Sequence, residues 1–364
     1  MNKNRRKLVI VAMSSGVDSS VAAALLKKQG YEVIGIFMHF WKEPLRNSLV
    51  ENKCCSLEAQ EDARRVCQIL EIPLYTANVE KEFKKEVVDY FLREYAHGRT
   101  PNPCVVCNEN IKFNVLFKKM LEMKADFIAS GHYALKREIK SGERTIYKLF
   151  QGKDSEKDQS YFLYNFNQKQ LARILFPIGD YKKSEIRKIA KKGKLPVFNK
   201  DDSQGLCFTP EKYPEGFLRR NLKLKKGKIV NTQGKSIGTH EGLPLYTIGQ
   251  RRGINIGGDG PYYVAGKDLQ KNILVVTNNE KDPALYRSGL EVEKVNWIAG
   301  KPQNGVKILL KTRYRNPLVS GIIKLNNNQR YKIIFKEPQR AISPGQSAVF
   351  YRRSGELLGG GVIK

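Results

Sequence analysis

Acidic residues are scarce in this chain of 364 residues, which has 36 Asp and Glu against 65 Lys and Arg. The formal net charge is +29, and the excess of basic residues is spread along the whole sequence instead of forming one basic tail. A solvated surface tuned for solubility is one explanation of such a charge. We favour another, a polyanionic partner, whose binding is then expected to weaken as salt rises.

Long hydrophobic runs are also missing, and no apolar segment is long enough to cross a bilayer. The apolar segment Leu8–Met13 follows basic residues as in a signal peptide, but it is short and leads into a Ser/Gly/Asp loop without a cleavage pattern. We interpret it as a buried first strand and expect a cytoplasmic protein without a membrane partner. The composition is typical of a globular chain, and the length predicts two or three domains.

Cysteine is absent from the last third of the chain, and the six cysteines are Cys54, Cys55, Cys67, Cys104, Cys107 and Cys207. This clustering suits reactive or metal-ligating thiols in a reducing cytoplasm better than a disulfide scaffold. Cys67 lies on the inner side of an amphipathic helix, so we expect it to be a small buried hydrophobe. The roles of Cys54 and Cys55 stay undecided.

Strands and helices alternate in the first half. Lys7–Met13 is a predicted strand, Ser20–Gln29 a helix and Glu32–Met38 a second strand, which together form a βαβ unit of a parallel sheet. Further helices and strands follow as far as a strand at Phe127–Ser130. The pattern predicts an α/β fold with a doubly wound parallel sheet, in which ligands bind at the carboxyl ends of the strands.

The pattern changes near Cys207. Lys228–Val230 with Ser236–Ile237, and then Tyr262–Ala265 with Ile273–Val276, are predicted hairpins around Gly- and Asn-rich turns. From Leu290 onward there are about six strand-like runs without a helix signal, which predicts a small β-barrel or sandwich. We therefore divide the chain into an α/β domain at 1–210, a central mostly-β domain at 211–282 and an all-β domain at 283–364.

The first strand leads into Ser14-Ser15-Gly16-Val17-Asp18-Ser19-Ser20, which opens a helix. Small residues let backbone amides surround an anion, and the helix N-terminus adds its dipole. A plain strand-to-helix turn with Ser20 as N-cap is the alternative. The loop is neither a Walker A nor a Rossmann motif. It is similar to the SGGxDS loop of the PP-loop ATP pyrophosphatases, with Ser15 in place of the first Gly.

A pair of thiols is predicted at the start of another helix. Asn102 is a good N-cap and Pro103 suits the first helical position, so Cys104 and Cys107 fall in the first turns and share one face. Thiols at a helix N-terminus are rich in thiolate, as nucleophiles and soft-metal ligands require. Cys207 ends a polar loop able to carry a thiol to and from a buried site. A structural zinc site is not expected, because no second C-x-x-C or paired His exists.

Over essentially its full length the sequence resembles the tRNA-specific 2-thiouridylases, members of the PP-loop superfamily with an adenine nucleotide α-hydrolase-like fold. The joint order and spacing of several segments carry the resemblance. They are Ala12–Ser19, Gly35–Met38, Arg99–Pro103 through Cys107-Asn108, Ser130–Tyr133, Gly152-Lys153 with Lys157–Gln159, Asp202–Phe208, Tyr246–Arg251 and Arg313–Arg315.

The resemblance implies a site for each reactant. ATP, together with Mg²⁺, would be held by Ala12, Met13, Ser14, Ser15, Gly16, Val17, Asp18, Ser19, Met38 and Gly131. Asn102, Pro103 and Cys104 would lie against a flipped base of tRNA, and Lys157, Asp158, Gln159, Arg313 and Tyr314 would also contact the tRNA. The implied substrates are the isoacceptors for Lys, Glu and Gln, at the wobble uridine.

The implied activity is that of a tRNA-uridine 2-sulfurtransferase that consumes ATP to AMP and pyrophosphate. Adenylating the uracil oxygen makes AMP the leaving group, so that sulfur can attack C2 of the flipped base. Cys207 would accept persulfide sulfur from a relay protein or a cysteine desulfurase. Cys107 would complete the transfer and could form a transient disulfide with Cys207.

Three alternatives stay open. Many family members have Asp at the position of Cys104, so Cys104, Cys107 and Cys207 could instead ligate an iron–sulfur cluster that carries the sulfide. A PP-loop synthetase for a small substrate is a second alternative, although it needs neither the charge of +29 nor paired thiols. A non-catalytic tRNA-binding protein is the third, and it predicts salt-sensitive binding that survives Cys107→Ser.

Overall fold

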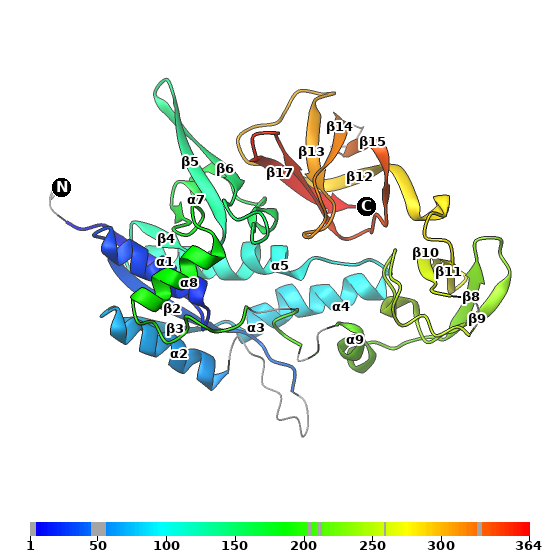
Figure 1. Cartoon of the computed structure of the whole chain (residues 1–364), viewed down its shortest axis with the longest axis horizontal. Helices are drawn as coiled ribbons and strands as arrows, with labels where there is room; N and C mark the ends of the chain where they lie inside the picture. Colours follow the sequence, from blue (N-terminus) through cyan, green and yellow to red (C-terminus); the bar gives the residue numbers. More distant parts are fainter. Residues whose placement is uncertain are drawn as a thin grey trace.

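The structure is a computed structural model that describes residues 5–44, 56–202, 205–209, 211, 213–257, 260–325 and 330–364. Cys54, Cys55, Ser203 and Gln204 lie outside these residues. Figure 1 shows an α/β part on the left, a small β part at the lower right and a second β part at the upper right. Within the described ranges, no helix is long and apolar enough to cross a membrane.

The α/β part contains a five-stranded parallel sheet in the order β3-β2-β1-β4-β7. Its strands are β1 Leu8–Met13, β2 Glu32–His39, β3 Leu74–Asn78, β4 Phe127–Ala129 and β7 Ile174–Leu175. Alternate side chains of central β1 enter two hydrophobic cores, Val9 and Val11 on one face and Ile10 on the other. The predicted doubly wound sheet is therefore confirmed.

Helices cover both faces of this sheet (Figure 1). α1, α2 and α8 pack on the face of Val9, and α4 and α6 on the face of Ile10. Two long helices each contain a π-helical segment, α3–η1–α4 and α5–η2–α6. The bounds are α1 Val17–Lys28, α2 Leu57–Ile69, α3 Glu80–Phe83, η1 Lys84–Val88, α4 Asp89–Ala96, α5 Pro103–Val106, η2 Cys107–Lys112, α6 Phe113–Glu122, η3 Ser160–Phe162, α7 Gln168–Leu171, α8 Lys183–Lys192 and α9 Glu215–Asn221.

The predicted start of the first helix at Ser20 is wrong. The helix begins at Val17 with Gly16 as its N-cap, and Ser20 is buried in the first turn. The Ser20 hydroxyl donates back to the Gly16 carbonyl over 2.9 Å, so it stabilises the turn instead of capping it.

The central β part is a four-stranded sheet in the order β10-β11-β8-β9. Both predicted hairpins are present and antiparallel, and a parallel pairing of β8 with β11 joins them. The elements are β8 Gly227–Asn231, β9 Ser236–His240, η4 Leu243–Leu245, β10 Tyr263–Asp268, β11 Ile273–Thr277 and η5 Pro283–Leu285.

The C-terminal part is a barrel, the first of the two predicted options. Antiparallel pairings run in the order β12-β15-β14-β13-β16-β17, and β12 also pairs with β17, which closes the ring. Its core contains Val292, Leu310, Ile333 and Phe350. The strands are β12 Tyr286–Trp297, β13 Lys307–Lys311, β14 Val319–Leu325, β15 Tyr331–Arg340, β16 Ser347–Tyr351 and β17 Glu356–Ile363.

One hairpin was not predicted from the sequence. β5 Ala134–Ser141 and β6 Arg144–Gln151 leave the α/β part after β4 and form an antiparallel pair. β6 then pairs with β17 of the barrel through Leu149 and Phe150. The first and last parts of the chain therefore share one eight-stranded sheet.

Candidate active site

The loop between β1 and α1 is held in shape by its own serines. The Ser14 hydroxyl accepts a hydrogen bond from the Gly16 amide over 3.1 Å and lies 2.9 Å from the Ser19 hydroxyl, which itself donates to the Gly16 carbonyl. Gly16 has no side chain to cap α1, so no capping side chain occupies the backbone N–H groups at the helix start. This arrangement suits an anion such as a phosphate.

Gly131 lies against this loop at the point where the strand order reverses between β1 and β4. A Cβ atom on Gly131 would lie only 2.7 Å from the carbonyl carbon of Asp18 and from the amide nitrogen of Ser19. Only glycine therefore lets the segment after β4 touch the start of α1. Two of the predicted ATP residues, Gly131 and Asp18, are in direct contact.

We expect Gly131→Ala to weaken both the fold and the nucleotide loop. The added methyl group must displace backbone atoms, a type of overpacking that costs about 1–3 kcal/mol. Calorimetry should show a lower melting temperature, and equilibrium binding a weaker affinity for ATP. Gly257→Ala is the control, because a Cβ there meets nothing within 4 Å. Equal behaviour of the two variants would contradict the assigned contact.

A chain of charged side chains leads away from the nucleotide loop. The Asp18 carboxylate accepts hydrogen bonds from the Tyr133 hydroxyl over 2.7 Å and from the Lys183 ammonium over 2.8 Å. Lys183 also pairs with Asp202 over 2.7 Å, and Asp202 pairs with Lys157 over 2.7 Å. A predicted ATP residue and a predicted tRNA residue are thus connected through two residues that belong to neither predicted set.

The environment of this network keeps the Tyr133 hydroxyl protonated and the Asp202 carboxyl group ionised. Burial and the negative charge of Asp18 raise the pKa of Tyr133, which therefore stays a hydrogen-bond donor. Burial alone would raise the pKa of Asp202, but hydrogen bonds from Lys157 and Lys183 hold it below its usual value. Sequence reasoning missed Lys183, because a lysine at the start of a basic helix has no distinctive local pattern.

The predicted thiol helix starts at Pro103, as expected. Asn102 is at the N-cap position, but its side chain makes no capping hydrogen bond and is instead hydrogen-bonded to the Tyr161 hydroxyl. Cys104 is exposed, whereas Cys107 is only 9% exposed and begins the π-helical segment η2. The two thiols therefore differ in access: one lies at the surface and the other against the core.

An aromatic group lies next to Cys104. The Tyr314 ring is tilted against Phe162 with centroids 4.5 Å apart and lies 6.0 Å from Tyr161. Burial raises the pKa of Tyr314 to about 12, and the negative charges of Asp158 and Cys104 act in the same direction. The structure thus brings together Asn102, Cys104 and Tyr314 from distant parts of the sequence.

Other predicted tRNA residues make hydrogen bonds inside the protein. The Arg313 guanidinium donates to the carbonyls of Ile248 and Ala341 and to the Ser343 hydroxyl, which ties the barrel to the central part. The carboxylate of Asp158 is buried, and the side-chain oxygen of Gln159 accepts a hydrogen bond from the Tyr133 amide. Asp158 accepts from the Gln151 side chain and from the amides of Gly152 and Ser160.

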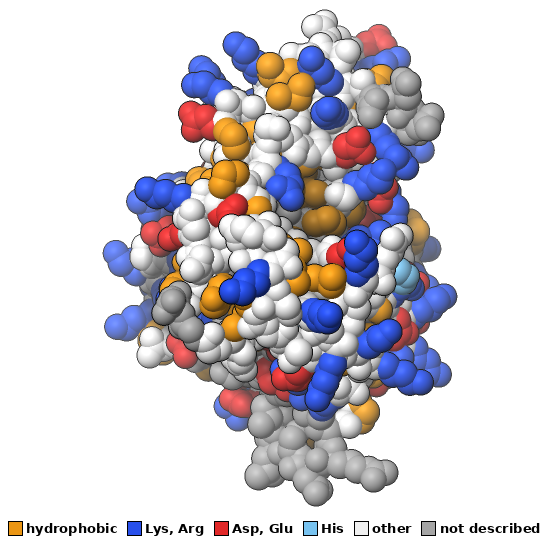
Figure 2. All heavy atoms as spheres, turned by 90° about the vertical axis from the view of Figure 1, so that its right-hand side faces the viewer, with side chains coloured by type: hydrophobic (Ala, Val, Ile, Leu, Met, Phe, Trp, Pro, Cys, Tyr) orange, Lys and Arg blue, Asp and Glu red, His pale blue; other side chains and the backbone are white. Residues whose placement is uncertain are grey.

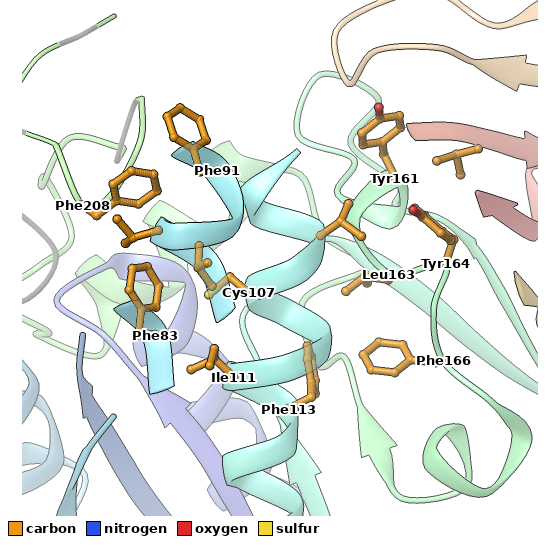
Figure 3. Close-up of a cluster of buried hydrophobic side chains, with 14 of the residues drawn as sticks. Phe83, Phe91, Cys107, Ile111, Phe113, Tyr161, Leu163, Tyr164, Phe166 and Phe208 are labelled. Atoms are coloured by element: carbon orange, nitrogen blue, oxygen red, sulfur yellow. The ribbon is translucent and has the colours of Figure 1, made fainter. Parts of the chain in front are cut away.

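Cys207 is exposed, but the next residue is anchored in the core. The Phe208 ring packs edge-on against Phe91 with centroids 5.3 Å apart and against Phe83 at 6.0 Å. Cys107 belongs to the same hydrophobic cluster, and Figure 3 shows its side chain on the side of the helix that faces Phe83 and Phe208. Two cysteines that are 100 positions apart are therefore brought to one region through Phe208.

The iron–sulfur alternative needs three thiols close enough to share a metal. Across the described parts of the chain, no group of three or more His, Cys, Asp or Glu residues could hold a metal ion. Cys104, Cys107 and Cys207 all lie in those parts and form no such group. The arrangement of these three thiols does not fit an iron–sulfur cluster.

Comparison with known proteins covers nearly the whole chain. Residues 7–211 match the family model described as tRNA methyl transferase HUP domain, 215–278 the tRNA methyl transferase PRC-barrel domain, and 287–363 the aminomethyltransferase beta-barrel domain. The chain is 45% identical to the tRNA-specific 2-thiouridylase MnmA of Alkaliphilus oremlandii, over 94% of this chain and 93% of that one.

Two further relatives agree. The chain is 44% identical to the MnmA protein of Vibrio cholerae serotype O1, over 99% of this chain and 97% of the other. It is 45% identical to that of Halothermothrix orenii, over 98% of both chains. Because the identity extends through the nucleotide loop, the thiol helix and both β parts, this chain belongs to the tRNA-specific 2-thiouridylase family.

Proposed function

We propose that this protein catalyses the ATP-dependent thiolation of uridine at C2 in tRNA. The observation that carries the proposal is the arrangement of the two cysteines. Phe208 anchors the segment of Cys207 in the cluster that contains Cys107, and Asp202 in the preceding segment is joined to the nucleotide loop through Lys183. Activation by ATP and delivery of sulfur can therefore occur at one place.

The first step activates the base. ATP binds with its phosphates at the start of α1, with Ala12–Ser19, Met38 and Gly131 around it. Asp18 would hold a Mg²⁺ ion, which would neutralise charge on the phosphates. The C2 oxygen of the uracil attacks the α-phosphorus, and pyrophosphate leaves. The oxygen then departs with AMP, which lowers the barrier to attack at C2.

The second step transfers sulfur. A relay protein or cysteine desulfurase loads Cys207 with a persulfide, and its terminal sulfur attacks C2 as AMP leaves. The Cys107 thiolate then attacks the sulfur of Cys207, which breaks the S–S bond and releases 2-thiouridine. The Cys107–Cys207 disulfide takes up the oxidation, and an external thiol reduces it for the next cycle.

The polyanionic substrate suits the surface of the molecule. Lys and Arg side chains are scattered over the whole face in Figure 2, with fewer acidic side chains among them. Phe162 and Tyr314 are only partly buried and offer aromatic rings beside Asn102 and Cys104, where an unstacked base could lie. We further propose wobble uridine in the tRNAs for Lys, Glu and Gln as the target, contacts of Lys157, Asp158, Gln159 and Arg313 with that tRNA, and a cytoplasmic location.

We also propose that the chain is divided into three domains, at 1–210, 211–282 and 283–364. The hairpin β5–β6 belongs to the first of these by sequence, but it pairs with the last. Because of this pairing, RNA that binds the barrel would lie beside the part of the chain that carries the nucleotide loop.

The test measures AMP release and the modified nucleoside together. With ATP, a persulfide donor and tRNA, we expect AMP release that depends on tRNA, and 2-thiouridine in the digested product by mass spectrometry. A tRNA with cytidine at the wobble position is the control and should give neither. AMP release driven by a small amine in the absence of tRNA would favour a synthetase, and transfer of a methyl group to tRNA would favour the activity that appears in two family-model descriptions.

A further inference from the structure

Cys207 lies in a short turn whose last residue is buried. The Thr209 amide donates to the Leu206 carbonyl over 3.4 Å, which closes a turn of residues 206–209 around the thiol. The Thr209 hydroxyl then donates to the Glu211 carbonyl over 3.2 Å, and Thr209 itself is buried. The position of Glu211, four residues after Cys207, therefore affects where this turn lies.

The carboxylate of Glu211 is held by Arg220 of helix α9. The Arg220 Nη1 atom donates to Glu211 Oε1 over 2.5 Å. This hydrogen bond is the main cause that holds the pKa of Glu211 below its usual value, so the side chain is ionised at neutral pH. The carboxylate also lies close to α9 itself, because a Cβ on Gly216 would be only 2.8 Å from Glu211 Oε1. A charge-assisted hydrogen bond is strong and directional, so it fixes this side chain in one place.

The same guanidinium makes a bidentate contact with Glu43, in the segment that follows strand β2. Arg220 Nε donates to Glu43 Oε1 over 3.0 Å, and Arg220 Nη2 donates to Glu43 Oε2 over 2.7 Å. The Asn221 side-chain amide adds a donor to Glu43 Oε1 over 2.9 Å, and only 7% of the Glu43 side chain is exposed. Strand β2 contains Met38, one of the residues proposed to surround ATP. Arg220 therefore joins the segment of Cys207 to the segment that leaves the proposed nucleotide site.

An aromatic contact fixes helix α9 against the same two segments. The Phe217 ring is fully buried and packs edge-on against Phe208 with centroids 5.4 Å apart. It also packs edge-on against Trp41 with centroids 6.5 Å apart. Because Arg220 follows Phe217 by three residues, it lies about one helical turn further along α9. The core contact of Phe217 therefore gives Arg220 a fixed base from which its guanidinium reaches both carboxylates.

We propose that Arg220 is a positioning residue for sulfur transfer: its guanidinium binds Glu43 and Glu211 together and thereby sets where Cys207 lies relative to the activated base. The inference rests on the proposed function of Cys207 as the sulfur carrier. Arginine suits this role because its planar guanidinium presents several donors in a fixed fork, whereas an ammonium group is a point charge. Neither carboxylate belongs to the nucleotide loop, so adenylation of the base should not depend on Arg220.

The decisive variant is Glu211→Met, which removes the acceptor near Cys207 and leaves Arg220 free to keep its pair with Glu43. Methionine has a similar length and no carboxylate. Arg220→Met is the second variant. It also takes donors away from the buried Glu43 carboxylate, which lowers stability, so the melting temperature of both variants is measured first.

We would preload Cys207 with radioactive sulfur from a cysteine desulfurase, add ATP and tRNA, and follow pyrophosphate and labelled 2-thiouridine in a single turnover. Glu211→Met and Arg220→Met should release pyrophosphate at the native rate but form 2-thiouridine about 100-fold more slowly, the loss expected when a reacting group is misplaced by about 1 Å. Their combination should be no slower than Arg220→Met alone, because both changes remove the same contact. Arg219→Met is the matched control and should be native in both measurements, because Arg219 pairs with Glu241 of the central part.

The outcomes separate this inference from the proposed function. If Glu211→Met and Arg220→Met form 2-thiouridine at the native rate while Cys207→Ser forms none, Arg220 has no positioning role and the sulfur chemistry stands. If Cys207→Ser also forms 2-thiouridine, the proposed function itself fails. An equal loss of pyrophosphate release and 2-thiouridine formation, with a lower melting temperature, would show that Arg220 only stabilises the fold.

Discussion

Cys207→Ser is expected to abolish thiolation of tRNA while pyrophosphate release on adenylation of the base continues. A serine hydroxyl cannot carry a persulfide, so no sulfur reaches the activated base. Adenylation needs only the nucleotide loop and the uracil oxygen, and it does not involve Cys207. Product nucleosides should contain no 2-thiouridine by mass spectrometry, and pyrophosphate should still form in the presence of tRNA.

Cys107→Ser should stop the reaction one step later. Radioactive sulfur from the donor should remain on Cys207, because the thiolate that breaks the S–S bond is missing. Cys67→Ala is the matched control: Cys67 is buried, and burial raises its pKa to about 11, so it stays a thiol at neutral pH. Thiolation by both serine variants at the native rate would exclude the relay.

Lys183→Met is expected to lower AMP release about 100-fold, the usual loss when one positioned cation or donor is removed from an active site. Lys183 is only 12% exposed in its side chain and pairs with both Asp18 and Asp202. Without it, two carboxylates repel each other across a partly buried space. Asp18 should then leave its place beside the Tyr133 hydroxyl, and the nucleotide loop should lose its shape.

Two control variants accompany Lys183→Met. Lys188→Met changes an exposed lysine of the same helix α8 and should leave AMP release unchanged. Lys183→Arg retains the charge and should recover part of the activity. Thiolation and pyrophosphate release should fall together in Lys183→Met, unlike in Cys207→Ser, in which pyrophosphate release continues. Native AMP release by Lys183→Met would show that the ion pairs serve only stability.

The sequence predicted those features that depend on local patterns. The buried strand Leu8–Met13, the Gly- and Asn-rich hairpins and the run of strands after Leu290 all produce periodicity or turn signals that are strong within a few residues. The hairpin β5–β6 was missed because its strand Ala134–Ser141 is rich in charged residues and has no continuous apolar face. It is stabilised by a partner in the barrel, about 200 residues away.

The site was predictable as a set of residues, but not as a set of contacts. Nothing near Asp158 indicates that its carboxylate is buried under the amides of Gly152 and Ser160. Likewise, the hydrogen bonds of Arg313 reach residues of the central part and the barrel turn. Such roles depend on how distant segments meet, and no local pattern encodes them.

The pairing of β6 with β17 has a consequence for biosynthesis. β6 leaves the ribosome long before β17, and until β17 emerges its edge has no partner on that side. Contacts so distant along the chain form slowly, because the intervening loop must close first. The nucleotide-binding half therefore stays incomplete, with an open strand edge exposed to other nascent chains, until the barrel has been synthesised.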